Sequence, residues 1–212
     1  MNFYTVARAC LGGFFRFFYN IRIIGKENEP TDEAFMVCAN HTSNRDVIVV
    51  GASFKRQVHY FAKAELFKIP ILRHFIKALG AFPVDRQNAA ASLGPIKMTL
   101  SLLEEGKTVG IFPQGTRYPG VDPRETLIKN GVGMIEYHAK VKVVPVLIKT
   151  KKWKVMPFRR TYVIIGKPLE YESFGYANGR GVEFAAASKK IFSSITDLID
   201  TPCDKGKNGK DE

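Results

Sequence analysis

Short apolar runs of strand length recur along this 212-residue chain and alternate with segments of helical character. The apolar runs occupy residues 19–25, 34–39, 58–62, 81–84, 108–112, 141–148 and 161–165. The helical segments occupy residues 46–54, 63–67, 71–79, 89–105, 134–137 and 182–199. Strands that alternate with helices predict an α/β fold, in which a mixed, largely parallel sheet is flanked by helices.

Proline and glycine residues refine this prediction. Pro83 falls inside an apolar run, and because proline cannot donate to a strand ladder, that strand is expected at a sheet edge or to end there. Gly106 is expected to end the helix at residues 89–105. No repeat or linker divides residues 21–200, which are predicted to form one domain, whereas residues 201–212 have nothing to bury and are expected to be disordered.

The first twenty residues are predicted to form an amphipathic helix. Arg8 and Arg16 interrupt its apolar sequence, so it is not expected to cross a bilayer, which takes about 20 predominantly apolar residues. Its wide apolar face is typical of a helix that lies in a membrane interface or caps a core, and its many aromatic side chains favour the interface. We therefore expect peripheral or monotopic attachment to the cytoplasmic face of the cell membrane. The polar stripe of this helix comprises Thr5, Arg8, Gly12, Arg16 and Asn20.

The chain is strongly basic, with a formal net charge of +12 from 32 Lys and Arg against 20 Asp and Glu. Such a charge attracts anionic partners, among which nucleic acid, anionic lipid and acidic carrier proteins all qualify. Three cysteines lie far apart, without the spacing of metal ligands or of a disulfide framework, so we expect a reducing compartment and no metal site.

The heptapeptide Asn-His-Thr-Ser-Asn-Arg-Asp at residues 40–46 carries the most suggestive chemistry. On one continuous helix His41 and Asp46 would lie roughly 140° apart around the axis, so a turn must separate them if they touch. With His41 at a strand end and Asp46 in the first turn of a helix, the carboxylate can fix the imidazole tautomer while His41 takes a proton. The alternative is a histidine that only hydrogen-bonds in a loop, followed by an ordinary first-turn acid.

Two further strand ends carry cations. The sequence Gly-Ala-Phe-Pro-Val-Asp-Arg ends in Arg86, whose planar guanidinium suits a phosphate, although it could also pair with Asp85 at the surface. The sequence Phe-Pro-Gln-Gly-Thr-Arg combines a backbone that a ligand can approach at Gly115 with the Thr116 hydroxyl and the Arg117 cation, although it could be a plain turn. Its glycine spacing resembles a nucleotide-binding P-loop, but the phosphate-binding lysine is missing.

His59, His74 and His138 have no carboxylate at a spacing comparable to that of His41 and Asp46. His59 falls within a predicted strand, His74 among apolar residues, and His138 near a helix end. We expect these three to be structural histidines.

Taken in order, the three motifs resemble those of the glycerophospholipid acyltransferase family, in particular its bacterial 1-acyl-sn-glycerol-3-phosphate acyltransferases. Val144-Pro145-Val146 resembles the short fourth motif of that family, and residues 61–70 resemble its connecting segment. The resemblance covers residues 21–166. One position departs from the family: an acid usually stands where this chain has Gln114, so a role that needs a carboxylate there is in doubt.

The resemblance implies transfer of a fatty acyl group from a thioester, of coenzyme A or acyl carrier protein, to the sn-2 hydroxyl of lysophosphatidic acid. His41 and Asp46 would be the catalytic residues, and no cofactor or metal would take part. The substrate-binding residues implied are Lys63, Arg86, Gln114, Gly115, Thr116 and Arg117.

Two other functions fit parts of the sequence. One is acylation of a different acceptor, such as glycerol-3-phosphate or another lysophospholipid, because acceptor choice depends on pocket shape. The other is a basic protein that binds nucleic acid or anionic membrane without catalysis. Nucleic acid is not the expected partner, because the basic residues are scattered and no nucleic-acid-binding motif is present.

Overall fold

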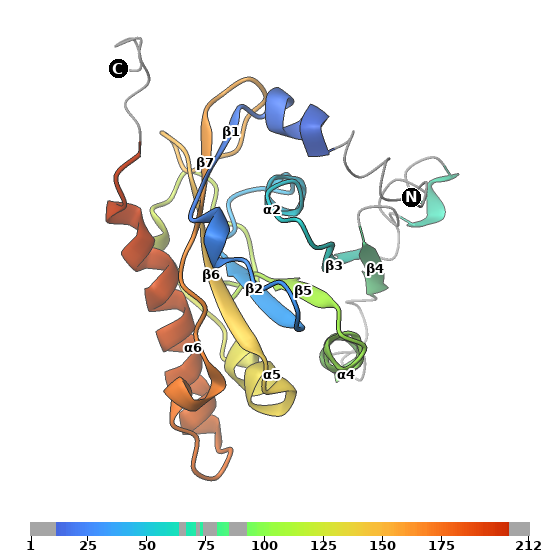
Figure 1. Ribbon diagram of the computed structural model, residues 1–212, viewed down its shortest axis with the longest axis vertical. Helices are drawn as coiled ribbons and strands as arrows, with labels where there is room; N and C mark the ends of the chain where they lie inside the picture. Colours follow the sequence, from blue (N-terminus) through green and yellow to red (C-terminus); the bar gives the residue numbers. More distant parts are fainter. Residues whose placement is uncertain (1–11, 64–66, 71–72, 74–79, 85–92, 204–212) are drawn as a thin grey trace.

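The computed structural model describes residues 12–63, 67–70, 73, 80–84 and 93–203. Within them seven strands form one sheet in the order β1-β7-β6-β2-β5-β3-β4 (Figure 1). Each predicted strand is present. Their bounds are β1 Ile21–Ile24, β2 Phe35–Ala39, β3 Val58–Lys63, β4 Ala81–Val84, β5 Thr108–Ile111, β6 Lys142–Lys149 and β7 Thr161–Ile165.

The sheet is mixed and largely parallel, as predicted. All neighbouring strands run parallel except β6 and β7, which pair antiparallel. β4 lies at one edge, which agrees with the edge position predicted from Pro83. Because β2, β5 and β6 are parallel neighbours, their carboxyl ends meet at one edge of the sheet. Side chains that follow these three strands are therefore brought together there.

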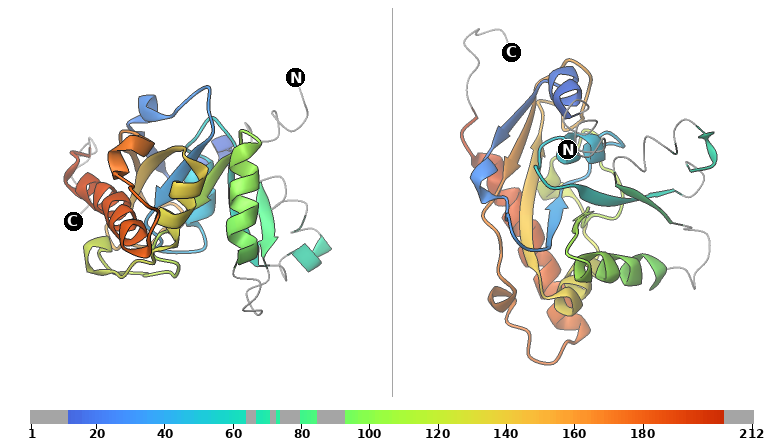
Figure 2. Two further views of the ribbon diagram at one scale, coloured as in Figure 1. Left: turned by 90° about the horizontal axis from the view of Figure 1, so that it is seen from below. Right: turned by 45° about the vertical axis from the view of Figure 1, so that its right-hand side comes forward.

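Helices cover both faces of the sheet, as Figure 2 shows from two further directions. Side chains of α2 pack on one face together with Tyr19, whereas side chains of α4, α5 and α6 pack on the other. The predicted helix at residues 46–54 ends three residues early, because the Ser53 amide bonds to the Val50 carbonyl in a tighter turn and Phe54 then enters the core. The α-helices with both ends among the described residues are α2 Asp46–Gly51, α4 Leu93–Glu104, α5 Gly131–Ala139 and α6 Gly181–Thr196.

The N-terminal segment predicted to be helical is described only from Gly12 onward, and residues 12–18 are helical. Phe15 and Phe18 pack against the core, whereas Phe14 and Phe17 are exposed. The described part of this segment thus covers the core with some aromatic side chains and presents others outward. Of the helices described, none combines the length and the apolar character needed to cross a membrane. The helix predicted at residues 71–79 is described only at residue 73, and the tail predicted at residues 201–212 is described only at residues 201–203, so neither prediction is tested.

The central strand β2 is buried on both faces, which is why its sequence is apolar without interruption. Phe35, Val37 and Ala39 point into the core beneath α2. Met36 and Cys38 point into the core beneath α5 and α6. This alternation fixes the register of β2, because a shift by one residue would exchange the two sets.

α5 and α6 pack closely at Gly133, which contacts the backbone of α6. The Gly133 amide donates to the Ser188 hydroxyl at 3.0 Å. A Cβ atom at residue 133 would lie 2.2 Å from the Phe184 carbonyl oxygen, inside van der Waals contact. Only glycine therefore allows this helix spacing.

We predict that Gly133→Ala lowers the free energy of unfolding by about 1–3 kcal/mol, since the added methyl group forces the two helices apart. Urea denaturation measures the change. Gly131→Ala in the same helix is the matched control, because a Cβ atom there meets nothing within 4 Å and should leave stability unchanged or slightly higher. Equal stability of the two variants would contradict this packing.

Candidate active site

The site begins where β2 ends, and Asn40 fixes that end to β6. Its side-chain amide donates to the Ile148 carbonyl at 3.1 Å and accepts from the Ile148 amide at 2.7 Å. Asn40 is fully buried, so both bonds are shielded from water. The side chain continues the pairing of β2 with β6 after the strand has ended, and the backbone is then free to bend at His41.

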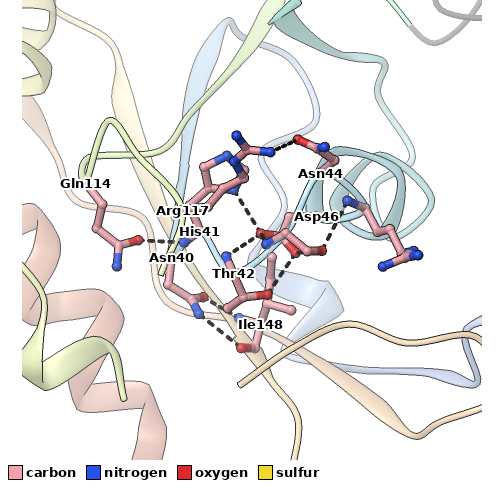
Figure 3. Close-up of polar contacts among 10 residues, drawn as sticks. Asn40, His41, Thr42, Asn44, Asp46, Gln114, Arg117 and Ile148 are labelled. Carbon is pink, nitrogen blue, oxygen red and sulfur yellow. Dashed lines mark hydrogen bonds and ion pairs between the residues drawn. The ribbon is translucent and has the colours of Figure 1, made fainter. Parts of the chain in front are cut away.

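His41 and Asp46 meet across this bend, as predicted (Figure 3). Nδ1 of His41 lies 2.9 Å from Oδ2 of Asp46, the first residue of α2. The Asp46 carboxylate also accepts bonds from the backbone amides and the hydroxyls of Thr42 and Ser43. Asp46 is fully buried, whereas the His41 side chain keeps 17% of its surface exposed. One carboxylate thus holds both the bend and the imidazole.

An aromatic stack supports the other side of the imidazole. The Phe112 ring lies 4.0 Å from the His41 ring, centroid to centroid, at an angle of 12°. Tyr60 stacks on Phe112 in turn, with centroids 5.7 Å apart. Gly110 makes room for Tyr60, since a Cβ atom there would lie 2.0 Å from the ring. The supporting roles of Phe112, Tyr60 and Gly110 are not predicted from the sequence, because nothing along the chain indicates which ring lies beside His41.

Gln114 braces the backbone of His41 from the strand β5 side. Its Oε1 accepts from the His41 amide at 2.6 Å, and its Nε2 donates to the Thr126 hydroxyl at 2.7 Å. That hydroxyl donates to the Pro123 carbonyl at 2.7 Å, so it is placed to accept from an amide. Gln114 is 3% exposed. A neutral amide fits this position because it is a donor at one end and an acceptor at the other.

Arg117 and the residues beside it line the same edge. Nη1 of Arg117 donates to the Asn44 side chain at 2.6 Å, and the Tyr118 amide donates to the His41 carbonyl at 2.9 Å. Gly115 has a φ of 65°, the left-handed region that favours glycine. Gly115, Thr116 and Arg117 are all exposed, so this segment is accessible from outside.

The other predicted binding residues are described only in part or not at all. Lys63 is the last residue of β3, where its backbone pairs in register with Val84. Arg86 lies outside the described residues, as does His74. Among the residues that the structure describes, no group of three or more His, Cys, Asp or Glu side chains could hold a metal ion.

The two other described histidines occupy the structural positions expected of them. His59 is buried in β3, where its Nδ1 lies 3.1 Å from the Gly80 carbonyl and burial lowers its pKa. His138 is exposed in the last turn of α5.

The arrangement is suited to proton abstraction by His41. With Nδ1 on Asp46, Nε2 is the nitrogen that can accept a proton, and the buried carboxylate stabilises the imidazolium that results. Tyr60 is no rival base: burial, followed by the negative charge of Asp46, raises its pKa well above the ordinary value. The edge therefore offers a histidine whose geometry suits general base chemistry, close to an exposed cation.

A mostly parallel α/β sheet with a His-Asp pair at its carboxyl edge agrees with the family that the motifs resemble. The profile of the Acyltransferase family matches residues 20–149, more than half of the chain. The chain belongs to this family.

Individual relatives define the family branch more closely. The 1-acyl-sn-glycerol-3-phosphate acyltransferase of Bacillus subtilis (strain 168) is 35% identical over 84% of this chain and 87% of that protein. The enzyme of the same name from Streptococcus pneumoniae is 29% identical over 73% of this chain and 57% of that protein. The crystal structure of the 1-acyl-sn-glycerophosphate (LPA) acyltransferase PlsC from Thermotoga maritima superposes with a TM-score of 0.68 at 25% identity, covering 94% of this chain and 81% of that one.

The hydrogen bonds that Gln114 makes with the His41 amide and the Thr126 hydroxyl can be tested through protein stability. Gln114→Leu should lower the free energy of unfolding by about 1–3 kcal/mol, because the partly buried His41 amide loses its acceptor. Gln114→Glu keeps an acceptor for that amide and should lose less. Thermal or urea denaturation of the two variants measures the difference. A leucine variant as stable as the glutamate variant would contradict a stabilising role for the bond between Gln114 and the His41 amide.

Proposed function

We propose that this protein transfers a fatty acyl group from an acyl thioester to the sn-2 hydroxyl of 1-acyl-sn-glycerol-3-phosphate and so produces phosphatidic acid for phospholipid synthesis. The observation that carries this proposal is the contact between His41 and Asp46 at the carboxyl edge of the sheet. The names of the relatives from Bacillus subtilis, Streptococcus pneumoniae and Thermotoga maritima support the choice of acceptor.

His41 acts as the general base in this mechanism. Its Nε2 takes the proton of the acceptor hydroxyl while Asp46 holds Nδ1. The hydroxyl oxygen then forms a bond with the thioester carbonyl carbon, and the bond between that carbon and sulfur breaks. The protonated His41 returns its proton to the departing thiolate. General base catalysis of this kind contributes typically about 10²–10⁴-fold to the rate.

Direct transfer fits the site better than a covalent acyl-serine. Ser43 is the serine nearest to His41 in the sequence, but its hydroxyl donates to Asp46 at 3.0 Å and accepts from the Arg45 amide at 3.1 Å. Ser43 is also buried. Its hydroxyl is thus engaged in building the bend.

Arg117 is the proposed contact for the acceptor phosphate. It is exposed at the edge that carries His41 and is tied to Asn44, three residues further along the bend. Its guanidinium keeps further N–H donors for a phosphate. The family resemblance adds Arg86, Lys63, Gly115 and Thr116 to the binding set. In this proposal Gln114 does not contact the substrate itself and supports the binding residues indirectly, because both ends of its amide already bind the protein.

The acyl donor is proposed to be a thioester of coenzyme A or of acyl carrier protein, with no cofactor. Peripheral or monotopic attachment to the cytoplasmic face of the cell membrane is proposed as the location. The net charge of +12 supports an anionic partner, and the exposed Phe14 and Phe17 side chains favour an anionic membrane surface over nucleic acid.

His41→Ala should lower kcat for acyl transfer to 1-acyl-sn-glycerol-3-phosphate by about 10²–10⁴-fold, because the general base is lost. Thiol release from an acyl thioester, measured with and without the acceptor, reports the reaction. His138→Ala is the matched control and should retain the wild-type rate. Retention of most activity by His41→Ala would remove it from the catalytic role.

Arg117→Ala should raise KM for the phosphorylated acceptor by about tenfold or more, since a charge-assisted hydrogen bond is worth roughly 1.5–3 kcal/mol. KM for the thioester should change little. Arg124→Ala is the control, because Arg124 is an exposed arginine of the same connecting segment that pairs with Asp200. An unchanged acceptor KM in Arg117→Ala would exclude the phosphate contact.

A further inference from the structure

The connection between β6 and β7, residues 150–160, lies at the edge of the sheet that carries the site. β6 runs parallel to β2, so the end of β6 and the end of β2 lie at the same edge. The Trp153 carbonyl accepts from the Gly120 amide at 3.0 Å, and the Val155 carbonyl lies 3.5 Å from Nη1 of Arg45. We call residues 150–160 the β6–β7 loop. It contacts both segments that build the site.

Two apolar side chains of the β6–β7 loop face outward. Met156 is 43% exposed and Phe158 is 68% exposed. Phe158 has a φ of 58°, a left-handed conformation that is unusual for a bulky residue. Its amide donates to the Phe18 carbonyl at 2.7 Å, and this bond ties the backbone at Phe158 to the N-terminal helical turn.

The β6–β7 loop and the N-terminal helical turn form one continuous apolar surface. The Phe158 ring lies 4.8 Å from the Phe18 ring, and Phe14 stacks on Phe18 at 5.6 Å, centroid to centroid. Phe14 and Phe17 are exposed one turn apart on the same helix. Figures 1 and 2 both show this helical turn beside the β6–β7 loop. Large exposed apolar side chains gathered in one place mark an interaction surface.

The charge around this surface indicates which partner it fits. The β6–β7 loop has the sequence Thr-Lys-Lys-Trp-Lys-Val-Met-Pro-Phe-Arg-Arg, with five cations and no acidic residue. Lys152, Lys154 and Arg159 are exposed. Aromatic and aliphatic side chains among cations are complementary to a bilayer interface that contains anionic lipid.

We propose that the β6–β7 loop is a membrane contact in its own right, in addition to the N-terminal helix. Met156 and Phe158 enter the interface of a bilayer, while Lys152, Lys154 and Arg159 lie at the anionic headgroups. The lipid surface then lies beside the edge that carries His41. The inference rests on the proposed membrane location and does not depend on the identity of the acyl acceptor.

A single tryptophan in the β6–β7 loop tests this contact directly. Trp153 is the only tryptophan of the chain, so Trp153→Phe combined with Met156→Trp leaves one probe at the proposed interface. Vesicles of phosphatidylcholine and phosphatidylglycerol with brominated acyl chains should quench its fluorescence. The matched control combines Trp153→Phe with Val182→Trp. Val182 is 82% exposed and lies in the first turn of α6. The other end of α6 leads into the turn that contains Ile199, whose carbonyl accepts from Lys149 at the site edge. A probe at residue 182 therefore lies at the end away from the site and should not be quenched.

Charge provides a second, independent measurement. Lys152→Gln with Lys154→Gln should weaken sedimentation with anionic vesicles by about tenfold or more, since each cation at an anionic surface contributes about fivefold. Binding to vesicles of phosphatidylcholine alone should not change. The control combines Lys26→Gln with Lys189→Gln and removes the same amount of charge. Lys26 is exposed at the opposite edge of the sheet, and Lys189 is exposed on the outer face of α6. This control should bind vesicles as the wild type does.

Several outcomes would overturn the inference. An unquenched probe at residue 156 in protein that still sediments with vesicles would mean that the chain attaches elsewhere. Equal weakening by the two lysine pairs would mean that net charge alone decides binding. A wild-type protein that does not bind vesicles, yet transfers acyl groups in detergent micelles, would exclude this surface while leaving the proposed reaction intact.

Discussion

The contact between His41 and Asp46 depends on a carboxylate that organises its own surroundings. Asp46 accepts five hydrogen bonds, one of them from the imidazole and four from Thr42 and Ser43. Those four bonds fold residues 42–46 into the bend that brings His41 back over α2. A buried carboxylate with this many donors is both stabilised and held in one orientation. The same interaction therefore builds the turn and orients the proposed base.

The two neighbouring strands then restrain that bend. β6 holds its first residue through Asn40, and the segment that follows β5 supplies Phe112 against the ring and Gln114 against the backbone. These restraints converge because parallel strands end at a common edge. A base held on several sides by rigid elements loses little entropy on reaching the reactive geometry. The same edge also carries the exposed aromatic and basic surface of the β6–β7 loop.

The sequence alone was sufficient for much of the fold. Apolar runs of strand length predicted the strands, since a strand buried on both faces consists mostly of apolar residues. Pro83 predicted the edge position of β4, since proline cannot donate to a ladder. The spacing of His41 and Asp46 predicted a turn, since one straight helix would hold them apart. These features are local, because each follows from the backbone geometry of a few consecutive residues.

Only the tertiary structure decided which distant residues support the site. Gln114 carries no charge, and its supporting role follows from its place between the His41 amide and the Thr126 hydroxyl. The stacking of Phe112 on His41 could not be predicted either, since it requires β2 and β5 to be neighbours in the sheet. Local sequence patterns likewise do not predict the order of the strands in the sheet or the antiparallel pairing of β7 with β6. Local periodicity reports which face of an element is buried, whereas the partner against which it is buried is chosen by packing of the whole chain.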